Sequence, residues 1–186
     1  MRDYIRDYID RLEQGLREIN PVTIERVVET LENARRERRT IFIIGNGGSA
    51  ATASHMANDL QKLASQGKDV AFRAIALTDN VPLITAWAND VNYKEVFTRQ
   101  LEVLAQTGDL LIVITGSGNS KNIVHAVKWA KAAELTTIAL LGFDGGEVMN
   151  LADHALLFAE DHYGRVEDAH MILEHIIANY LHDLSE

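Results

Sequence analysis

The chain has 186 residues, 47% hydrophobic and 24% charged, which is ordinary for one soluble globular domain with a proper core. Its 27 acidic and 18 basic residues give a net charge of -9, which argues against a nucleic-acid or membrane-surface binder. The absence of cysteine excludes disulfides, thiolate metal sites and cysteine nucleophiles.

The N-terminal segment MRDYIRDYIDRLEQ is charged and helical in period, and it lacks the apolar core of a signal peptide. No apolar run approaches the roughly 18 residues needed to cross a bilayer. We therefore expect a cytoplasmic protein with neither a membrane nor a nucleic-acid partner.

Two helices are predicted before the first strand. The second begins after Pro21, a residue that suits the first helical turn, and it buries an apolar face. Because these helices have no sheet partner of their own, we expect them to pack across the domain or against another subunit. In the first helix the residues at helical spacing on one face are Tyr4, Ile5, Tyr8, Ile9, Leu12 and Leu16.

From Thr40 onward, strand and helix signals alternate. Helical patterns cover residues 49–63, 82–88, 93–105, 121–135 and 165–184. Apolar runs without alternation, separated by helices, predict a five-stranded parallel sheet covered on both faces, a three-layer α/β fold. We expect a single domain over 1–186, with helices in 1–38 and the α/β core in 39–186. The strand-like runs are TIFIIG, AFRAIAL, DLLIVIT, TTIALLG and HALLFA.

Two glycine-rich loops, GNGGS at 45–49 and TGSGNS at 115–120, each follow a predicted strand and open a helix. In parallel sheets, ligands bind where strands end and helices begin, and glycine lets backbone N–H groups approach an anion. The alternative is that both loops are tight turns in which Ser49 and Ser120 only cap helices. Two such loops in one sheet favour a phosphate cradle.

We expect the second loop, which carries more hydroxyl groups, to hold the phosphate, and Asn46 and Gly47 to bind sugar hydroxyls. The residues of the two loops that are predicted to bind substrate are Asn46, Gly47, Gly48, Ser49, Thr115, Gly116, Ser117 and Ser120.

His55 and Asp59 are four residues apart in the helix after the first loop, so they share one helical face. They fit an exposed polar pair of small effect, or a metal or acid–base pair at the rim of the sugar pocket, because imidazole and carboxylate on adjacent turns can reach one zinc ion. The closing helix carries further candidates. Glu167 and His175 lie about two turns, or ~12 Å, apart, so one ion bridges them only if the helix breaks or a second subunit contributes.

Other polar residues have plain structural interpretations. We expect Glu174 to be solvated and His170 to be a structural histidine with satisfied hydrogen bonds. Asn89 and Asp90, in the segment WAND, fit a turn that ends a helix.

Five segments cover most of the chain in this order: GNGGSAATASHMANDL, WANDVNYKEVFTRQL, TGSGNSKNIVHAV, LLGFDGGEV and GRVEDAHMILEHII. Together they resemble the sugar-isomerase (SIS) domain family and, within it, the phosphoheptose isomerases. The resemblance implies a cytoplasmic homotetramer with sites at subunit interfaces. It also implies conversion of sedoheptulose 7-phosphate to glycero-manno-heptose 7-phosphate, often with zinc, for heptose precursors.

The resemblance gives His55 as a metal-binding histidine, and we expect His55, Asp59, Glu167 and His175 to be the ligands of one Zn²⁺ or another divalent ion. Asp59 takes the place of a family glutamate that acts as catalytic base, and His175 that of an essential histidine.

The substrate site implied by the resemblance also includes Asn89, Asp90 and Glu167. Three departures stand out: Asp59 is one methylene shorter than glutamate, Glu167 replaces glutamine and adds a charge, and Gly116 replaces a hydroxyl residue.

The groups fit an aldose–ketose isomerisation. A base removes a proton beside a carbonyl, an enediol forms, and an acid serves the oxygens, with metal polarising the carbonyl. Two alternatives stay open: a non-catalytic SIS module that binds a sugar phosphate or a replication-initiator partner, and an isomerase for another phosphosugar. The four metal-competent groups favour an enzyme.

Overall fold

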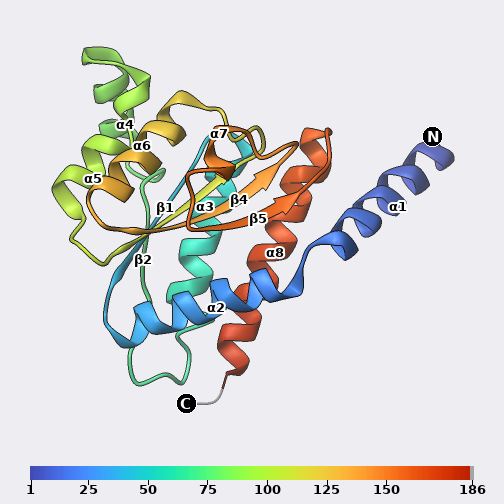
Figure 1. Cartoon of the computed structure of the whole chain (residues 1–186), viewed down its shortest axis with the longest axis horizontal. Helices are drawn as coiled ribbons and strands as arrows, with labels where there is room; N and C mark the ends of the chain where they lie inside the picture. The colour runs from blue at the N-terminus through green and yellow to red at the C-terminus, as the bar shows by residue number, and fades with distance from the viewer. Residues whose placement is uncertain (185–186) are drawn as a thin grey trace.

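A computed structural model describes residues 1–184 of the chain. Its centre is one sheet of five parallel strands in the order β2-β1-β3-β4-β5 (Figure 1). The predicted parallel sheet is confirmed, and only the edge strand β2 is clearly shorter than its apolar run. The strands are β1 (Thr40–Gly45), β2 (Arg73–Ala76), β3 (Leu110–Thr115), β4 (Thr136–Gly142) and β5 (His154–Phe158).

The helices match the predicted segments with one division and one addition. The segment predicted as a helix over 93–105 is divided into a 3-10 turn and a separate α-helix, and the short helix α7 has no predicted counterpart. No helix in residues 1–184 is long and apolar enough to cross a membrane. The helices are α1 (Arg2–Glu18), α2 (Pro21–Arg36), α3 (Gly48–Gln61), α4 (Val81–Asp90), η1 (Tyr93–Glu95), α5 (Thr98–Leu104), α6 (Lys121–Ala132), α7 (Gly146–Met149) and α8 (Tyr163–Asp183).

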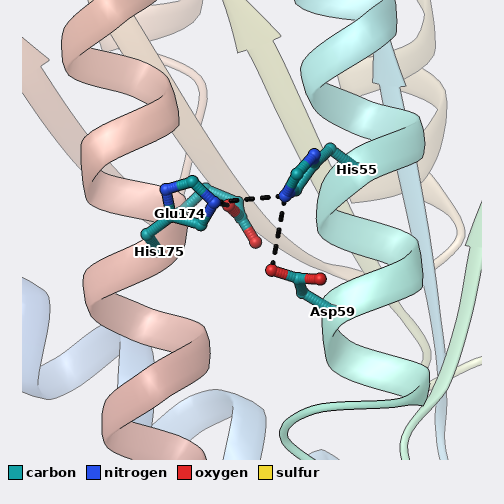
Figure 2. Close-up of side chains that lie close together, drawn as sticks. All are labelled: His55, Asp59, Glu174 and His175. Carbon is teal, nitrogen blue, oxygen red and sulfur yellow. Dashed lines mark hydrogen bonds and ion pairs between the residues drawn. The ribbon is translucent and has the colours of Figure 1, made fainter.

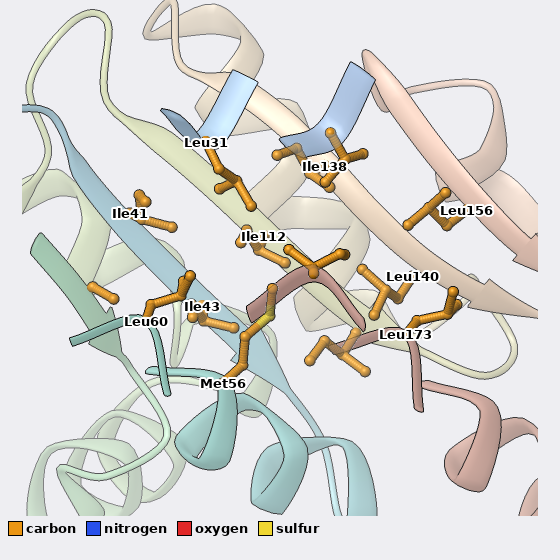
Figure 3. Close-up of a cluster of buried hydrophobic side chains, with 14 of the residues drawn as sticks. Leu31, Ile41, Ile43, Met56, Leu60, Ile112, Ile138, Leu140, Leu156 and Leu173 are labelled. Carbon is orange, nitrogen blue, oxygen red and sulfur yellow. The ribbon is translucent and has the colours of Figure 1, made fainter. Parts of the chain in front are cut away.

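Both faces of the sheet are covered, as continuous apolar strands require. One core lies between the sheet and helices α2, α3 and α8, where Leu31, Met56 and Leu173 interdigitate with strand residues such as Ile112 (Figure 3). The second core lies between the opposite face and α5, α6 and α7, together with Val96 and Phe97 between η1 and α5. All six residues of β1 and of β3 are buried, so these two central strands are fixed on both sides.

The two N-terminal helices behave differently. Helix α2 packs on the sheet, whereas α1 has no buried residue and extends away from the body of the molecule (Figure 1). Its contact with α8 includes a hydrogen bond of 2.6 Å from the Tyr8 hydroxyl to Asp168. Tyr4, Ile5 and Ile9 remain exposed on α1.

This topology sets up two places for chemistry. Strands β1 and β3 are neighbours, so the loops at their carboxyl ends lie side by side. Helices α3 and α8 both begin at that edge of the sheet and pack against the same core, so polar residues on their facing sides come together (Figure 2).

Candidate active site

The two glycine loops form one cavity of about 260 Å³ at the carboxyl ends of β1 and β3. It brings together all eight loop residues that the sequence predicts to bind substrate. Its lining residues are Asn46, Gly47, Gly48, Ser49, Ile114, Thr115, Gly116, Ser117, Ser120, Tyr163 and Glu167. None of them is basic, so an anion here would be held by backbone N–H groups and hydroxyls rather than by cationic side chains. We call this cavity the loop pocket.

Neither loop serine caps its helix with a side-chain hydrogen bond. Helix α3 is capped by Gly47, at φ 56°, and Ser49 lies inside the helix. Ser120 is at the N-cap of α6, but its side chain makes no capping hydrogen bond. The interpretation of these serines as mere caps is therefore wrong.

Asn46 is held in place by two residues that the sequence analysis did not identify. Its side-chain amide exchanges two hydrogen bonds, of 3.0 and 2.8 Å, with the amide of Asn122, which is buried at the start of α6. The hydroxyl of Tyr93, in η1, donates a third hydrogen bond of 3.0 Å to the Asn46 carbonyl oxygen. These bonds fix the plane of the Asn46 amide at the edge of the loop pocket.

Helix α8 closes the pocket with Tyr163 and Glu167. A Cβ atom added at Gly48 would lie 2.5 Å from both carboxylate oxygens of Glu167, so the glycine leaves room for that carboxylate. A Cβ atom at Gly116 would lie 3.0 Å from the Tyr163 ring, which packs edge-on against Phe143. The aromatic ring of Tyr163 thus covers the position at which Gly116 lacks a side chain.

Asn89 and Asp90 do not line the loop pocket. Both are exposed at the end of α4, and the Asn89 amide donates a hydrogen bond of 2.7 Å to the Asp90 carboxylate. Their predicted substrate contacts therefore require a substrate that extends beyond the loop pocket. The next segment does approach it, because Tyr93 reaches Asn46.

A second group of polar side chains lies between α3 and α8, where His55 and Asp59 meet Glu174 and His175 (Figure 2). One ligand atom from each of these four residues lies within 4.8 Å of the other three. His55 Nε2 lies 3.1 Å from His175 Nε2 and 3.4 Å from Asp59 Oδ2, and His175 Nε2 lies 3.5 Å from Glu174 Oε2. We call these four residues the histidine–carboxylate cluster.

Glu174 was expected to be solvated, and that expectation is wrong. Its side chain is fully buried, and neither carboxylate oxygen accepts a hydrogen bond. Burial, together with the negative charge of Asp59, raises the pKa of Glu174 to about 8. The cause is its position on α8: Glu174 follows Leu173 and precedes Ile177 on the face that packs into the core.

Glu167 is not brought into this cluster within one chain. Helix α8 runs without a break from Tyr163 to Asp183, so Glu167 stays about two turns from His175, as the spacing predicts. Its carboxylate lies beside Gly48 in the loop pocket instead. The chain supplies Glu174 where the resemblance implied Glu167.

His170 lies between these two parts of α8 and is fully buried. It was expected to be structural with satisfied hydrogen bonds, yet neither ring nitrogen makes a well-formed hydrogen bond. Burial lowers the pKa of His170 to about 4, despite the nearby backbone carbonyl of Leu141. The imidazole is therefore neutral at pH 7.

The donor set of the histidine–carboxylate cluster suits a divalent transition metal. Two imidazoles and two carboxylates are typical zinc ligands, with bonds of about 2.0–2.2 Å. The buried, unpartnered carboxylate of Glu174 is unfavourable without a cation or a proton. The residues present therefore fit a metal ion.

Comparison with known proteins gives a consistent result. Residues 3–142 match the family described as SIS domain. The phosphoheptose isomerase of Helicobacter pylori is 38% identical over 177 residues, covering 94% of this chain and 88% of that protein. The phosphoheptose isomerase of Sulfurimonas denitrificans is 43% identical over 148 residues, covering 79% of this chain and 74% of that protein. The structure of the Neisseria gonorrhoeae phosphoheptose isomerase superimposes with a TM-score of 0.88 at 30% identity, covering 98% of this chain and 96% of that one.

Proposed function

This chain belongs to the SIS-domain family and, within it, to the phosphoheptose isomerases, and we propose that it interconverts sedoheptulose 7-phosphate and glycero-manno-heptose 7-phosphate. The product would supply heptose precursors. The observation that carries the proposal is that a loop pocket suited to an anion and a histidine–carboxylate cluster are joined by the same helices, α3 and α8.

In this proposal the phosphate binds in the loop pocket, on the side of the second loop. Ser117 and Ser120 offer hydroxyl groups there, and the N-terminus of α6 favours a negative charge. Glu167 repels a dianion, so we assign it to sugar hydroxyls, as an acceptor. Asn46, fixed by its amide pair with Asn122, would bind a further sugar hydroxyl.

The distance between the two regions suits a long phosphosugar. His55 follows Gly48 by seven residues on α3, a rise of about 10 Å. An extended chain advances about 1.2 Å per bond, so seven carbons with a phosphate ester span a distance of the same order. A heptose phosphate held by its phosphate can therefore extend its carbonyl end toward the histidine–carboxylate cluster.

We assign the proton transfers to Asp59 and His175. The Asp59 carboxylate removes the proton from the carbon beside the carbonyl and returns it to the neighbouring carbon after the enediol has formed. In the metal-free site the His175 imidazole, about half exposed at the cluster, moves the proton between the two oxygens; with zinc on its Nε2 it would instead hold the ion that stabilises the charge on those oxygens. Both side chains contact His55 or lie next to it, so they can act on one end of a substrate.

We further propose one zinc ion per site, held by His55, Asp59 and His175 with a fourth ligand from α8. When bound, the ion would polarise the carbonyl and stabilise negative charge on the enediol oxygens. The support is the donor chemistry of the cluster and the separations of its ligand atoms.

The test is turnover of sedoheptulose 7-phosphate by the purified protein, with and without added zinc, followed as aldose formation. Asp59→Asn and His175→Ala should each abolish most of the turnover while circular dichroism shows an intact fold. Failure of the wild-type protein to convert any phosphosugar, with any divalent ion, would contradict the proposal. It would favour a module that only binds sugar phosphates.

We also propose a cytoplasmic homotetramer with active sites at subunit interfaces. The support is α1, whose exposed Tyr4, Ile5 and Ile9 form an apolar face that residues 1–184 leave uncovered. Light scattering after size-exclusion chromatography should give the mass of four chains. Replacement of Ile5 and Ile9 by glutamate should lower that mass.

A further inference from the structure

We infer that Glu174 is a ligand of the metal ion beside His175, and that it takes this place on α8 instead of the Glu167 of the same chain. The inference rests on the proposed function only in assuming a resident divalent ion. It assigns the complete ligand set, His55, Asp59, Glu174 and His175, to one chain.

The separations in the cluster match those of zinc ligands. Four ligands at the usual bond lengths of about 2.0–2.2 Å stand at the corners of a tetrahedron whose edges are about 3.4 Å. The measured edges are 3.1 Å for His55 to His175, 3.4 Å for His55 to Asp59 and 3.5 Å for His175 to Glu174. A small inward movement of the side chains brings the remaining pairs, all within 4.8 Å, to the same length.

The burial of Glu174 is the second and independent observation. Its side chain is fully buried, both oxygens lack a hydrogen-bond partner, and the carboxylate points between α8 and α3 toward His55 (Figure 2). A carboxylate in such a place is costly unless a cation compensates for the lost solvation. Asp59 differs, because its other oxygen accepts a hydrogen bond of 2.9 Å from Asn58. Of the two carboxylates in the cluster, Glu174 is therefore the one whose oxygens accept no hydrogen bond within residues 1–184.

Glu167 differs from Glu174 in its surroundings and in its distance from the histidine–carboxylate cluster. Seven residues of unbroken helix separate it from Glu174, a rise of about 10 Å that exceeds the length of a glutamate side chain. Its carboxylate already faces Gly48 in the loop pocket. Within one chain it therefore cannot join His175 on the same ion.

The two glutamates allow a matched experiment. Glu174→Gln and Glu167→Gln make the same chemical change on the same helix, because each replaces a carboxyl group with a neutral amide. Zinc is titrated into the metal-stripped full-length protein, and its affinity is measured by competition with a chromophoric chelator. We expect Glu174→Gln to weaken zinc binding by at least about tenfold, while Glu167→Gln stays within about twofold of the wild type.

A second measurement guards against misfolding. The rise in melting temperature that zinc produces in the wild type should persist in Glu167→Gln and disappear in Glu174→Gln. If Glu174→Gln does not fold, Glu174→Leu replaces it, because an apolar side chain suits this buried position and offers no ligand atom.

Three outcomes would overturn the inference: no zinc binding by the wild type, wild-type affinity in both Glu174 variants, or an equal loss in Glu167→Gln. Zinc binding that follows the expected pattern without isomerase turnover would contradict only the proposed function.

Discussion

The loop pocket and the histidine–carboxylate cluster share helices α3 and α8, yet they are built in different ways. The loop pocket is made by backbone: glycines, helix N-termini and small hydroxyl residues at the ends of adjacent parallel strands. The cluster is made by side chains that meet only because α3 and α8 pack against the same core. The first kind of site is fixed by sheet topology, and the second depends on the rotation of each helix about its axis.

This difference suggests a division of labour. A rigid backbone cradle suits an unreactive phosphate, which needs only to be held. Imidazoles and carboxylates with partly exposed faces suit the reacting end, where protons move. Mutations in the two regions should therefore affect different kinetic constants.

The largest expected effect tests this division directly. His175→Asn removes an imidazole from the cluster and should lower kcat by about 10²–10⁴-fold, because a proton-transfer group is lost. Ser120→Ala removes one hydroxyl from the loop pocket and should raise KM by roughly tenfold with little change in kcat. Steady-state kinetics with sedoheptulose 7-phosphate measures both constants.

Inhibition by inorganic phosphate provides the control for this pair. Its inhibition constant should rise in Ser120→Ala and stay the same in His175→Asn. If Ser120→Ala and His175→Asn change kcat by similar factors and KM by similar factors, binding and proton transfer are not separated between the two regions.

A second prediction concerns stability and contrasts one glycine from each of the two glycine-rich loops. Gly118 has φ 62°, and an added Cβ atom would lie 1.9 Å from the backbone oxygen of Gly145, which cannot move away alone. Gly118→Ala should therefore lower the free energy of unfolding by about 3 kcal/mol or more. Urea denaturation measures the change.

Gly48→Ala is the matched variant. The added Cβ atom would meet the end of the Glu167 side chain, which can rotate aside. We expect a cost below about 1 kcal/mol in stability and a higher KM, because Glu167 is displaced in the loop pocket. If Gly118→Ala loses as little stability as Gly48→Ala, the second loop moves more easily than its packing against Gly145 indicates.

The same contrast explains what the sequence could predict. Strands β1 and β3 are uniform apolar runs, and their glycine loops are local signals, so the loop pocket followed from the topology of a parallel sheet. His55 and Asp59 were paired correctly because both lie on one helix at a spacing of four residues. The predicted separation of Glu167 from His175 is confirmed, because α8 is unbroken.

Other features needed three-dimensional packing. Asn46 and Asn122 are 76 residues apart, and no local pattern links them. Glu174 did carry a signal, since it falls at helical spacing with Ile177, Ala178 and Leu181 on the apolar face of α8. The helical periodicity of α8 places the Glu174 carboxylate on the apolar face, so this pattern alone could have predicted that Glu174 is buried.

His170 provides a third prediction, because it sits on α8 between the loop pocket and the cluster. Its folded-state pKa of about 4 is below the ordinary value near 6.5, so the unfolded chain binds the extra proton more readily. Its contribution to stability is complete above pH 6.5 and is lost as the pH falls toward 4. The wild type should lose roughly 2 to 4 kcal/mol more than His170→Leu between pH 7 and pH 4.

Urea denaturation of metal-stripped protein at each pH gives this difference, because other titrating groups cancel between the two proteins. If the free energy of unfolding depends on pH in the same way for wild type and His170→Leu, the His170 imidazole is protonated as readily in the folded protein as in the unfolded chain.

The smallest effect should come from the amide pair that holds Asn46. Asn122→Asp keeps the shape of the side chain but sets a carboxylate oxygen against the Asn46 carbonyl oxygen, so the hydrogen bond from Asn122 is lost and repulsion replaces it. We expect kcat/KM to fall roughly tenfold, and zinc affinity to stay the same, because the cluster lies some 10 Å away along α3. Asn122→Leu removes the amide without adding charge, so its kcat/KM should fall by less than that of Asn122→Asp. Tyr93→Phe removes only one of the three hydrogen bonds to Asn46, so its kcat/KM should fall least. A change of zinc affinity in Asn122→Asp would mean that the two regions are coupled through the sheet, and that the cluster depends on more than the packing of α3 against α8.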